Sequence, residues 1–280
     1  MDLASLLTPD AGISKTLEFV CVLLFAVSLP IIVIELGWLA RHKKLNWPRV
    51  REMLASYSTV PPLVISTGLA TAMWLGIYTF IAALTPFSIA TSWATAMICL
   101  VLADFLYYWD HRFGHEVNGL WSLYHSVHHS SPVFDQSTAF RISFVDQFVV
   151  PVFYIPLVVA GFDPLLVASC QLVVVAYQSW IHTEMVGKLG WMDLVINTPS
   201  MHRVHHAAQP AYRDKNYGGI LMVWDHLFGT YQAEVERPAY GLVHPIGSAH
   251  PVTVHTIELV RLWRRLRSAQ NRLRLVLGRP

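Results

Sequence analysis

Long uncharged stretches are the first feature of this chain. Residues 53–103 contain no Asp, Glu, Lys or Arg. This stretch is long enough for two membrane helices of about 20 residues each, with a turn near Thr85-Pro86, where proline interrupts the apolar pattern. Another uncharged run covers residues 19–34. The pattern therefore predicts three membrane helices in the first part of the chain.

A second apolar pair follows the middle of the chain. Residues 147–162 and 164–183 carry no charged side chain, and the turn sequence Gly161-Phe162-Asp163-Pro164 separates them. The first member is short for a full span, so the sequence also permits a re-entrant hairpin. Together the five apolar runs predict an all-α, multi-span membrane bundle of about four to five transmembrane segments.

Composition agrees with a membrane protein. Hydrophobic residues make up 54% of the chain and charged residues only 14%, and the mean hydropathy is +0.43. Such values are too apolar for an ordinary soluble domain. The net charge of +2 does not indicate a nucleic-acid partner, because the basic residues lie mostly beside the apolar segments.

Histidines carry the strongest chemical signal. Eight of them form two copies of His-x-x-His-His and one preceding pair: His111 and His115, His125, His128 and His129, and His202, His205 and His206. Residues at i, i+3 and i+4 share one face of a helix, so each cluster is predicted to aim its imidazoles at one point. Imidazole binds iron, zinc, copper and nickel. Eight ligands are too many for one ion and suit two. The sequence therefore predicts a dinuclear metal site, against chance clustering as the alternative.

Other side chains lie where they could assist such a site. Asp104 precedes His111 by seven residues, close to the same helix face, and is predicted to orient an imidazole N–H; pairing with a basic residue is the alternative. His182 ends the last apolar run and is a candidate ninth ligand. Glu116 and Glu184 are candidate catalytic or cofactor-contacting acids, or ordinary interfacial acids.

Charge bias predicts the side of the membrane on which the histidines lie. Five basic residues between 41 and 51 follow the first apolar run, and such residues favour the cytoplasm. Counting spans from there places residues 111–129 and 202–206 on the cytoplasmic side. Thr198 and Pro199 supply a helix cap and a first helical residue just before His202. We expect a histidine-rich helical cap with the active site on the cytoplasmic face.

The ligand types narrow the choice of metal. Structural zinc closes with four ligands, and the His-Glu-x-x-His pattern of zinc proteases is absent from the sequence. Haem would need paired histidines in mid-membrane, whereas these lie at the ends of the apolar runs. Two iron ions that activate dioxygen fit a membrane site best. A non-catalytic metal- or haem-binding membrane protein remains the alternative from another class.

The motifs resemble the eight-histidine pattern of the fatty acid hydroxylase and sterol desaturase superfamily. The flanking sequences are similar to the alkylglycerol monooxygenases of that superfamily: residues 104–109 (DFLYYW), 115–118 (HEVN), 197–206 (NTPSMHRVHH), 214–219 (DKNYGG), and Trp224-Asp225 with 228–230 (FGT). The likeness covers about residues 95–232. It divides the chain into membrane spans (1–94), a di-iron domain (95–232) and a C-terminal loop and tail (233–280).

The resemblance implies a non-haem di-iron monooxygenase that uses dioxygen to hydroxylate a C–H bond of a lipid. A sterol or carotenoid oxidase or desaturase is the nearest alternative. Alkylglycerol monooxygenases take electrons from tetrahydrobiopterin, and Glu116 is the candidate pterin contact. The sequence has no dinucleotide fingerprint, cysteine-rich iron–sulfur motif or haem domain. Electrons are therefore expected from a diffusible reductant or a donor protein.

The C-terminal tail has a different character. Residues 261–279 contain seven arginines and no acid among Leu, Trp and Val. This composition predicts a basic amphipathic helix on anionic lipid headgroups. A solvated basic tail is the alternative.

Overall fold

The computed structural model describes residues 13–280, and this part of the chain is helical without a β-strand. The long helices are α2 (Ile13–Arg41), α4 (Val60–Leu84), α5 (Trp93–Glu116), α10 (Pro164–Tyr177) and α13 (Pro251–Ser268). Shorter helical segments connect them: α3 (Trp47–Tyr57), α6 (Asn118–Leu120), η2 (Trp121–His125), α7 (Ser126–His129), η3 (Gln136–Phe140), α8 (Asp146–Val149), η4 (Val150–Tyr154), α9 (Ile155–Val159), η5 (Gln178–Trp180), η6 (Gly190–Leu194), α11 (Pro199–His205), α12 (Val223–Phe228) and α14 (Arg272–Leu277).

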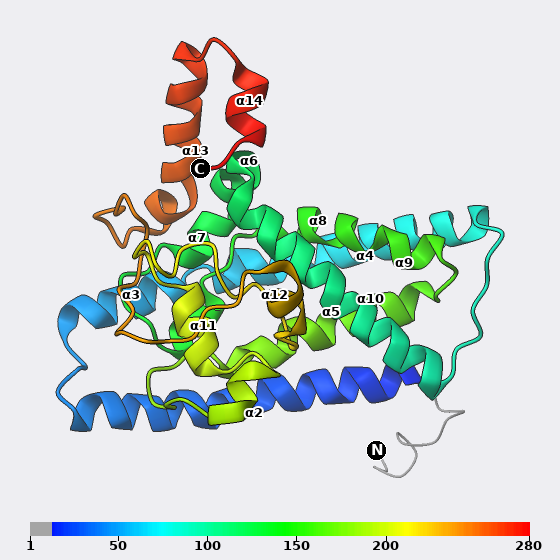
Figure 1. The fold of residues 1–280 in the computed structure, drawn as a ribbon, viewed down its shortest axis with the longest axis horizontal. Coiled ribbons are helices and arrows are strands. Elements are labelled where there is room, and N and C mark those ends of the chain that lie inside the picture. Colours follow the sequence, from blue (N-terminus) through cyan, green and yellow to red (C-terminus); the bar gives the residue numbers. More distant parts are fainter. Residues whose placement is uncertain (1–12) are drawn as a thin grey trace.

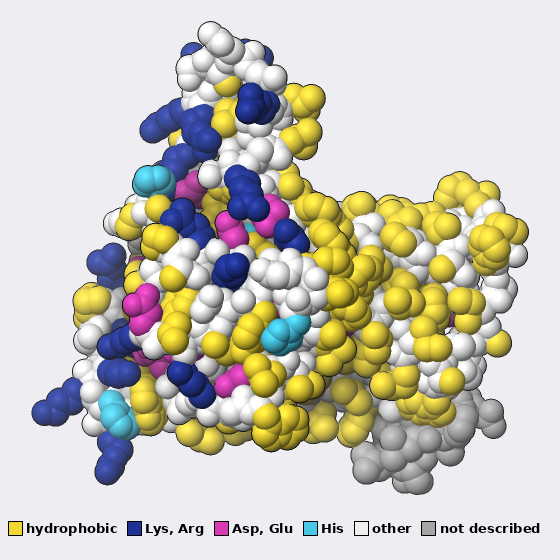
Figure 2. Space-filling model, in the orientation of Figure 1, with side chains coloured by type: hydrophobic (Ala, Val, Ile, Leu, Met, Phe, Trp, Pro, Cys, Tyr) yellow, Lys and Arg dark blue, Asp and Glu magenta, His cyan; other side chains and the backbone are white. Residues whose placement is uncertain are grey.

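Four helices, α2, α4, α5 and α10, form the bundle that carries the rest of the molecule (Figure 1). Small side chains line the α5–α10 contact, where Cys99, Ala103 and Cys170 are fully buried. Small residues let membrane helices approach closely. Apolar side chains such as Ile65 point outward from α4, and hydrophobic side chains cover the right-hand half of the molecule in Figure 2. This surface is suited to lipid.

The predicted helical bundle is confirmed in its class. Helix α2 and the run from Trp47 to Leu84 are long and apolar enough to cross a membrane. The predicted turn near Thr85-Pro86 is present, because α4 ends at Leu84 and α5 begins at Trp93. The number of spans stays a prediction.

The first half of the second apolar pair is not one helix. Residues 146–159 are divided into α8, η4 and α9, with Pro151 and Pro156 near the start of the second and third pieces. Proline has no N–H to donate and clashes with the preceding turn, so the segment breaks there. Helix α10 then begins at Pro164, where the Asp163 carboxylate accepts hydrogen bonds from the N–H groups of Leu165 and Leu166.

The arginine-rich tail is a helical hairpin rather than a single helix. Helix α13 leads away from the body and α14 returns toward α6 (Figure 1), and residues 269–271 form the break between them. The Asn271 side chain caps the second helix by accepting from Arg274 N–H. Placement of this hairpin on lipid headgroups stays a prediction.

Candidate metal centre

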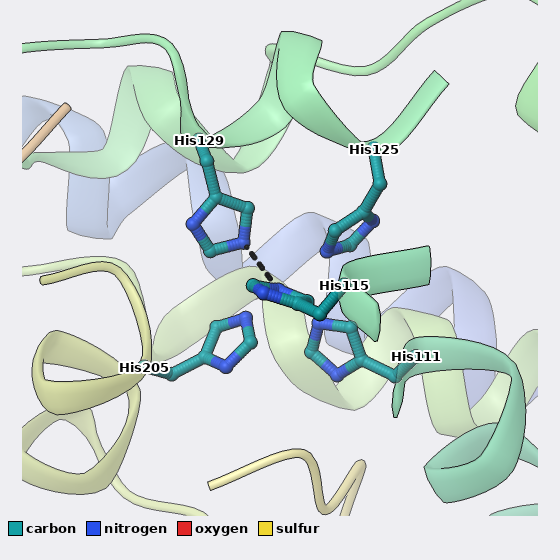
Figure 3. A group of neighbouring side chains, drawn as sticks. All are labelled: His111, His115, His125, His129 and His205. Atoms are coloured by element: carbon teal, nitrogen blue, oxygen red, sulfur yellow. Dashed lines mark hydrogen bonds between the residues drawn. The ribbon is translucent and has the colours of Figure 1, made fainter. Parts of the chain in front are cut away.

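Nine histidines converge in two groups. Group A contains His111, His115, His125, His129 and His205, and group B contains His128, His182, His202 and His206. Within each group, one nitrogen from every ring lies within 4.8 Å of the others. Figure 3 shows the five rings of group A turned toward one another from three separate segments. The candidate ninth ligand, His182, lies in group B with the other predicted histidines.

Each His-x-x-His-His motif is shared between the two groups, contrary to the expectation that each cluster aims at one point. In the first motif, His125 and His129 belong to group A and His128 to group B. In the second, His202 and His206 belong to group B and His205 to group A. The i and i+4 residues thus face one group, and the i+3 residue, rotated about 60° from i around a helix of 3.6 residues per turn, faces the other.

The two groups adjoin. The rings of His129 and His206 stack with centroids 4.3 Å apart, and those of His205 and His202 stack with centroids 5.2 Å apart. A pair of ions held by these rings would therefore share one site. The sequence predicted a dinuclear site from the number and spacing of the histidines, and two adjoining groups of rings are compatible with that prediction.

The local fold brings the first motif onto α5. Residues 121–125 form a single π-helical turn, a conformation that is frequent at functional sites. Gly114 on α5 allows the close contact, because a Cβ there would lie 3.2 Å from His125 Cγ and 3.3 Å from Tyr124 Oη. In the second motif, Thr198 accepts from Met201 N–H and Pro199 occupies the first turn of α11. The predicted helix start is confirmed.

Backbone carbonyls fix the tautomers of two rings in group A. His111 Nδ1 lies 2.9 Å from the carbonyl oxygen of Tyr217, and His205 Nδ1 lies 3.0 Å from that of Lys215. A carbonyl can only accept, so each Nδ1 carries the proton and donates. In the neutral ring, Nε2 is then a bare acceptor directed at the centre of the group, the usual arrangement of metal-binding histidines.

Group B uses the same device. His128 Nδ1 donates to the carbonyl oxygen of Arg141 at 3.3 Å, and His182 Nδ1 donates to that of Gln178 at 3.0 Å. Their Nε2 atoms are 3.2 Å apart, and two bare acceptors at this distance repel each other. The Nε2 atoms of His182 and His202 are also only 2.9 Å apart.

A cation would relieve this repulsion. Metal–imidazole bonds are about 2.1 Å long, which places ligands at right angles about 3 Å apart. His115 and His129 bring their Nε2 atoms to 3.1 Å in group A. The buried Nε2 atoms of His125 and His205 have no hydrogen-bond partner among the described residues. The donor set therefore fits two metal ions.

Burial keeps these imidazoles neutral. Loss of solvation and repulsion from His111 lower the pKa of His205 well below its usual value. The pKa of His206 is lowered in the same way by burial and by His128, and burial lowers the pKa of His128 to about 4. Neutral imidazole is the form that binds metal, so both groups have their ligand form at neutral pH.

Asp104 does not orient an imidazole, and this expectation is corrected. Its carboxylate accepts from Ile220 N–H at 2.6 Å, from Leu221 N–H at 3.1 Å and from the Trp224 indole N–H at 2.9 Å. Seven residues along a helix are about 10 Å, too far for Asp104 to reach the rings. It instead anchors the loop that presents the Tyr217 carbonyl to His111.

Asp225 holds the other side of that loop, and in the sequence only its place in the family motif singles it out. Its two oxygens accept from the N–H groups of Tyr217 and Gly218, both at 2.7 Å, and from the Thr230 hydroxyl at 2.7 Å. Side chain and loop are fully buried at this point. Asp225 and Asp104 thus hold the two ends of the turn that contains the Tyr217 carbonyl, the partner of His111.

Glu116 and Glu184 contact basic residues instead of a histidine. Glu116 pairs with Arg112 at 3.2 Å and with Arg279 at 3.1 Å. Glu184 lies 3.5 Å from Lys44 and 3.9 Å from Arg49. These contacts match the interfacial role that the sequence left open for both acids.

Glu35 is a buried acid that sequence reasoning missed. From α2 it accepts from the Thr183 hydroxyl at 2.5 Å and from Gln136 N–H at 2.6 Å. The Gln136 amide in turn donates to the carbonyl oxygen of His182 at 3.3 Å. An acid near the end of an apolar helix is a signal that could have identified it. It ties the segment carrying His182 to the bundle.

Comparison of the sequence with known proteins identifies relatives of this chain. Residues 96–230 match the fatty acid hydroxylase family model. The chain is 37% identical to alkylglycerol monooxygenase of Danio rerio over 272 residues, which is 94% of the chain and 60% of that protein. It is 43% identical to the Homo sapiens enzyme over 179 residues, 64% of the chain and 39% of the human protein.

More distant similarity extends to other lipid enzymes. The chain is 36% identical to ornithine lipid hydroxylase OlsE of Rhizobium tropici over 134 residues, 47% of the chain and 40% of that protein. The chain thus spans 60% or less of the length of each of these relatives. No solved structure matches it significantly.

Proposed function

The chain belongs to the fatty acid hydroxylase family, and we propose that it is a membrane-bound non-haem di-iron monooxygenase that hydroxylates a C–H bond of a lipid. The observation that carries this proposal is the pair of adjoining imidazole groups, in which the Nε2 atoms of His128 and His182 face each other at 3.2 Å while both Nδ1 atoms donate to carbonyl oxygens. Group A would hold one ion and group B the other.

Two iron ions bound there would supply the activation of dioxygen. The overall reaction consumes the lipid C–H, one dioxygen, two electrons and two protons, and yields the lipid alcohol and water. The protein residues bind and orient the ions: carbonyls of Tyr217 and Lys215 fix two rings of group A, and those of Arg141 and Gln178 fix two of group B. Eight of the nine histidines are buried and His128 is half-buried, so bulk water has little access to the rings.

The substrate we propose is an alkylglycerol-like ether lipid or a fatty acyl chain. The relatives named above act, by their names, on alkylglycerols and on ornithine lipid, and identity is higher to the former. A bundle with outward apolar side chains provides access from the membrane. We further propose that the site faces the cytoplasm and that tetrahydrobiopterin or a donor protein supplies the electrons.

The test is product analysis with labelled oxygen. Iron-loaded protein in detergent would be incubated with ¹⁸O₂, a reductant, and either an alkylglycerol or a fatty acyl lipid. Mass spectrometry should find one ¹⁸O atom in the lipid product, or in the aldehyde released if the ether-bearing carbon is attacked. Loss of two hydrogens without oxygen uptake would instead identify a desaturase. No lipid product with any reductant, from protein that holds haem or no redox metal, would contradict the proposal.

A further inference from the structure

One face of the histidine-bearing part exposes apolar side chains outside the bundle. Trp191, Leu194 and Val195 come from η6 and the residue after it, and Val223 and Leu227 come from α12. Trp191 is 72% exposed and Leu227 is 67% exposed. We call these five residues the apolar cap face. Sequence patterning did not indicate this face, because neither short segment has a clear helical or strand period.

The two segments are fixed side by side. Met222 N–H donates to the Val195 carbonyl oxygen at 3.0 Å, and Asn197 N–H donates to that of Ile220 at 2.8 Å. His226 Nε2 donates to the Leu194 carbonyl oxygen at 3.0 Å. These hydrogen bonds hold the residues of the apolar cap face in a defined arrangement.

Its pattern is inverted relative to a water-facing surface. The acids of the two segments, Asp193 and Asp225, point inward and are 6% and 0% exposed. Asp193 accepts from the Thr198 hydroxyl and from Leu189 N–H, so it caps the segment from within. Large apolar side chains point outward in their place. Exposed apolar clusters of this kind mark interaction surfaces.

The apolar cap face continues the lipid-facing surface of the bundle. Helix α12 lies directly on α5: Phe105 and Trp224 rings are 5.0 Å apart, and Trp109 and Phe228 rings are also 5.0 Å apart. Exposed Phe113 extends this aromatic row. In Figure 2 the hydrophobic side chains of the right-hand half run onto the front face, where Figure 1 places α12.

We propose that the apolar cap face dips into the lipid bilayer, in the leaflet nearest the histidines, and contacts acyl chains there. The observations favour lipid as the occupant, because the face is continuous with the bundle surface and its acids are turned away. An exposed tryptophan such as Trp191 is typical of the membrane interface. The loop behind this face supplies the Tyr217 carbonyl to His111. Bilayer lipid and group A would therefore lie on opposite sides of this loop.

Spin labelling can test this on the full chain in lipid nanodiscs. Trp191→Cys and Leu227→Cys replace exposed side chains, and the native Cys21, Cys99 and Cys170 are buried, so labelling should be selective. Ile65→Cys on α4 is the lipid-exposed control. Ala211→Cys, in an exposed turn of the same part of the molecule, is the water-exposed control.

The measurement is collision of each label with oxygen and with a water-soluble nickel chelate. Labels at 191 and 227 should be accessible to oxygen and protected from nickel, as at 65. Nickel accessibility equal to that at 211 would overturn the proposal. Immobilised labels protected from both agents would also overturn it, because they would show that a protein covers the face.

Discussion

Single backbone carbonyls decide which nitrogen is available to a metal in several of the rings. Four of the nine rings donate Nδ1–H to a carbonyl oxygen, and these partners come from Tyr217, Lys215, Arg141 and Gln178. Since a carbonyl cannot donate, the opposite nitrogen must remain an acceptor. In these four rings, main-chain geometry thus determines which nitrogen atom can bind a metal.

Replacing a ligand should therefore separate the site from the fold. His128→Ala removes a ring of group B, and His205→Ala removes one of group A. Each should lower activity by more than the roughly 10- to 100-fold that loss of a ligand's hydrogen-bond partner costs, with membrane insertion unchanged. His250→Ala, at an exposed residue outside both groups, should leave turnover near the parent value. Full turnover by His128→Ala would refute its assignment.

At the scale of elements, the loop from 214 to 222 lies between α11 and α12 in the chain and contacts α5 through Asp104 and His111. Gly218 lies where any side chain would collide, because a Cβ would be 2.5 Å from the Leu221 carbonyl oxygen and 2.9 Å from Asp225 Oδ2. The first atom belongs to the turn that follows the Tyr217 carbonyl, and the second belongs to the carboxylate that holds this turn. The loop can therefore take its shape only with glycine here.

Gly218→Ala should displace this turn at a cost of about 1–3 kcal/mol of stability, typical of overpacking, and weaken iron binding in group A. Gly187→Ala is the matched control, since a Cβ there has nothing within 4 Å. Iron content after dialysis against a weak chelator, together with the thermal midpoint, measures both effects. Equal iron retention by the two variants would contradict the role given to this loop.

Sequence periodicity predicted the elements better than the contacts between them. The capped start of α11 and the turn after Leu84 follow from local residue types. The division of each His-x-x-His-His motif between two groups does not, because one helix face cannot show what lies opposite. Asp104 shares a face with His111 yet serves a loop more than 100 residues away. Glu35 and Thr183 are equally remote in sequence.

For the whole molecule, the buried histidines predict acid sensitivity of the metal-free protein. His128 has a folded pKa of about 4, against about 6.5 when unfolded. A depressed histidine pKa means that the unfolded chain takes up the proton first. Its stabilising effect is therefore complete above pH 6.5 and declines below it, by about 1.4 kcal/mol per pH unit for each such residue. The midpoint temperature of thermal unfolding should decrease as the pH is lowered from 7.5 to 5.5. An unchanged midpoint would contradict this prediction.

Topology is a second property of the whole molecule, because both histidine motifs must emerge on one side of the membrane. Reporter fusions after Asn46, His129 and His206 should all report the cytoplasm, and one near Pro86 should report the opposite side, as the basic residues after α2 require. A fusion at His129 that disagreed with one at His206 would be incompatible with a shared centre.

The central claim is that groups A and B together hold two iron ions, and Mössbauer spectroscopy of active ⁵⁷Fe-loaded protein tests it most directly. The nine converging imidazoles predict two iron atoms per chain, with no haem signal. His202→Ala and His205→Ala should each disturb the ion of their own group first. A single iron per chain in fully active protein, or full activity with zinc alone, would contradict the account.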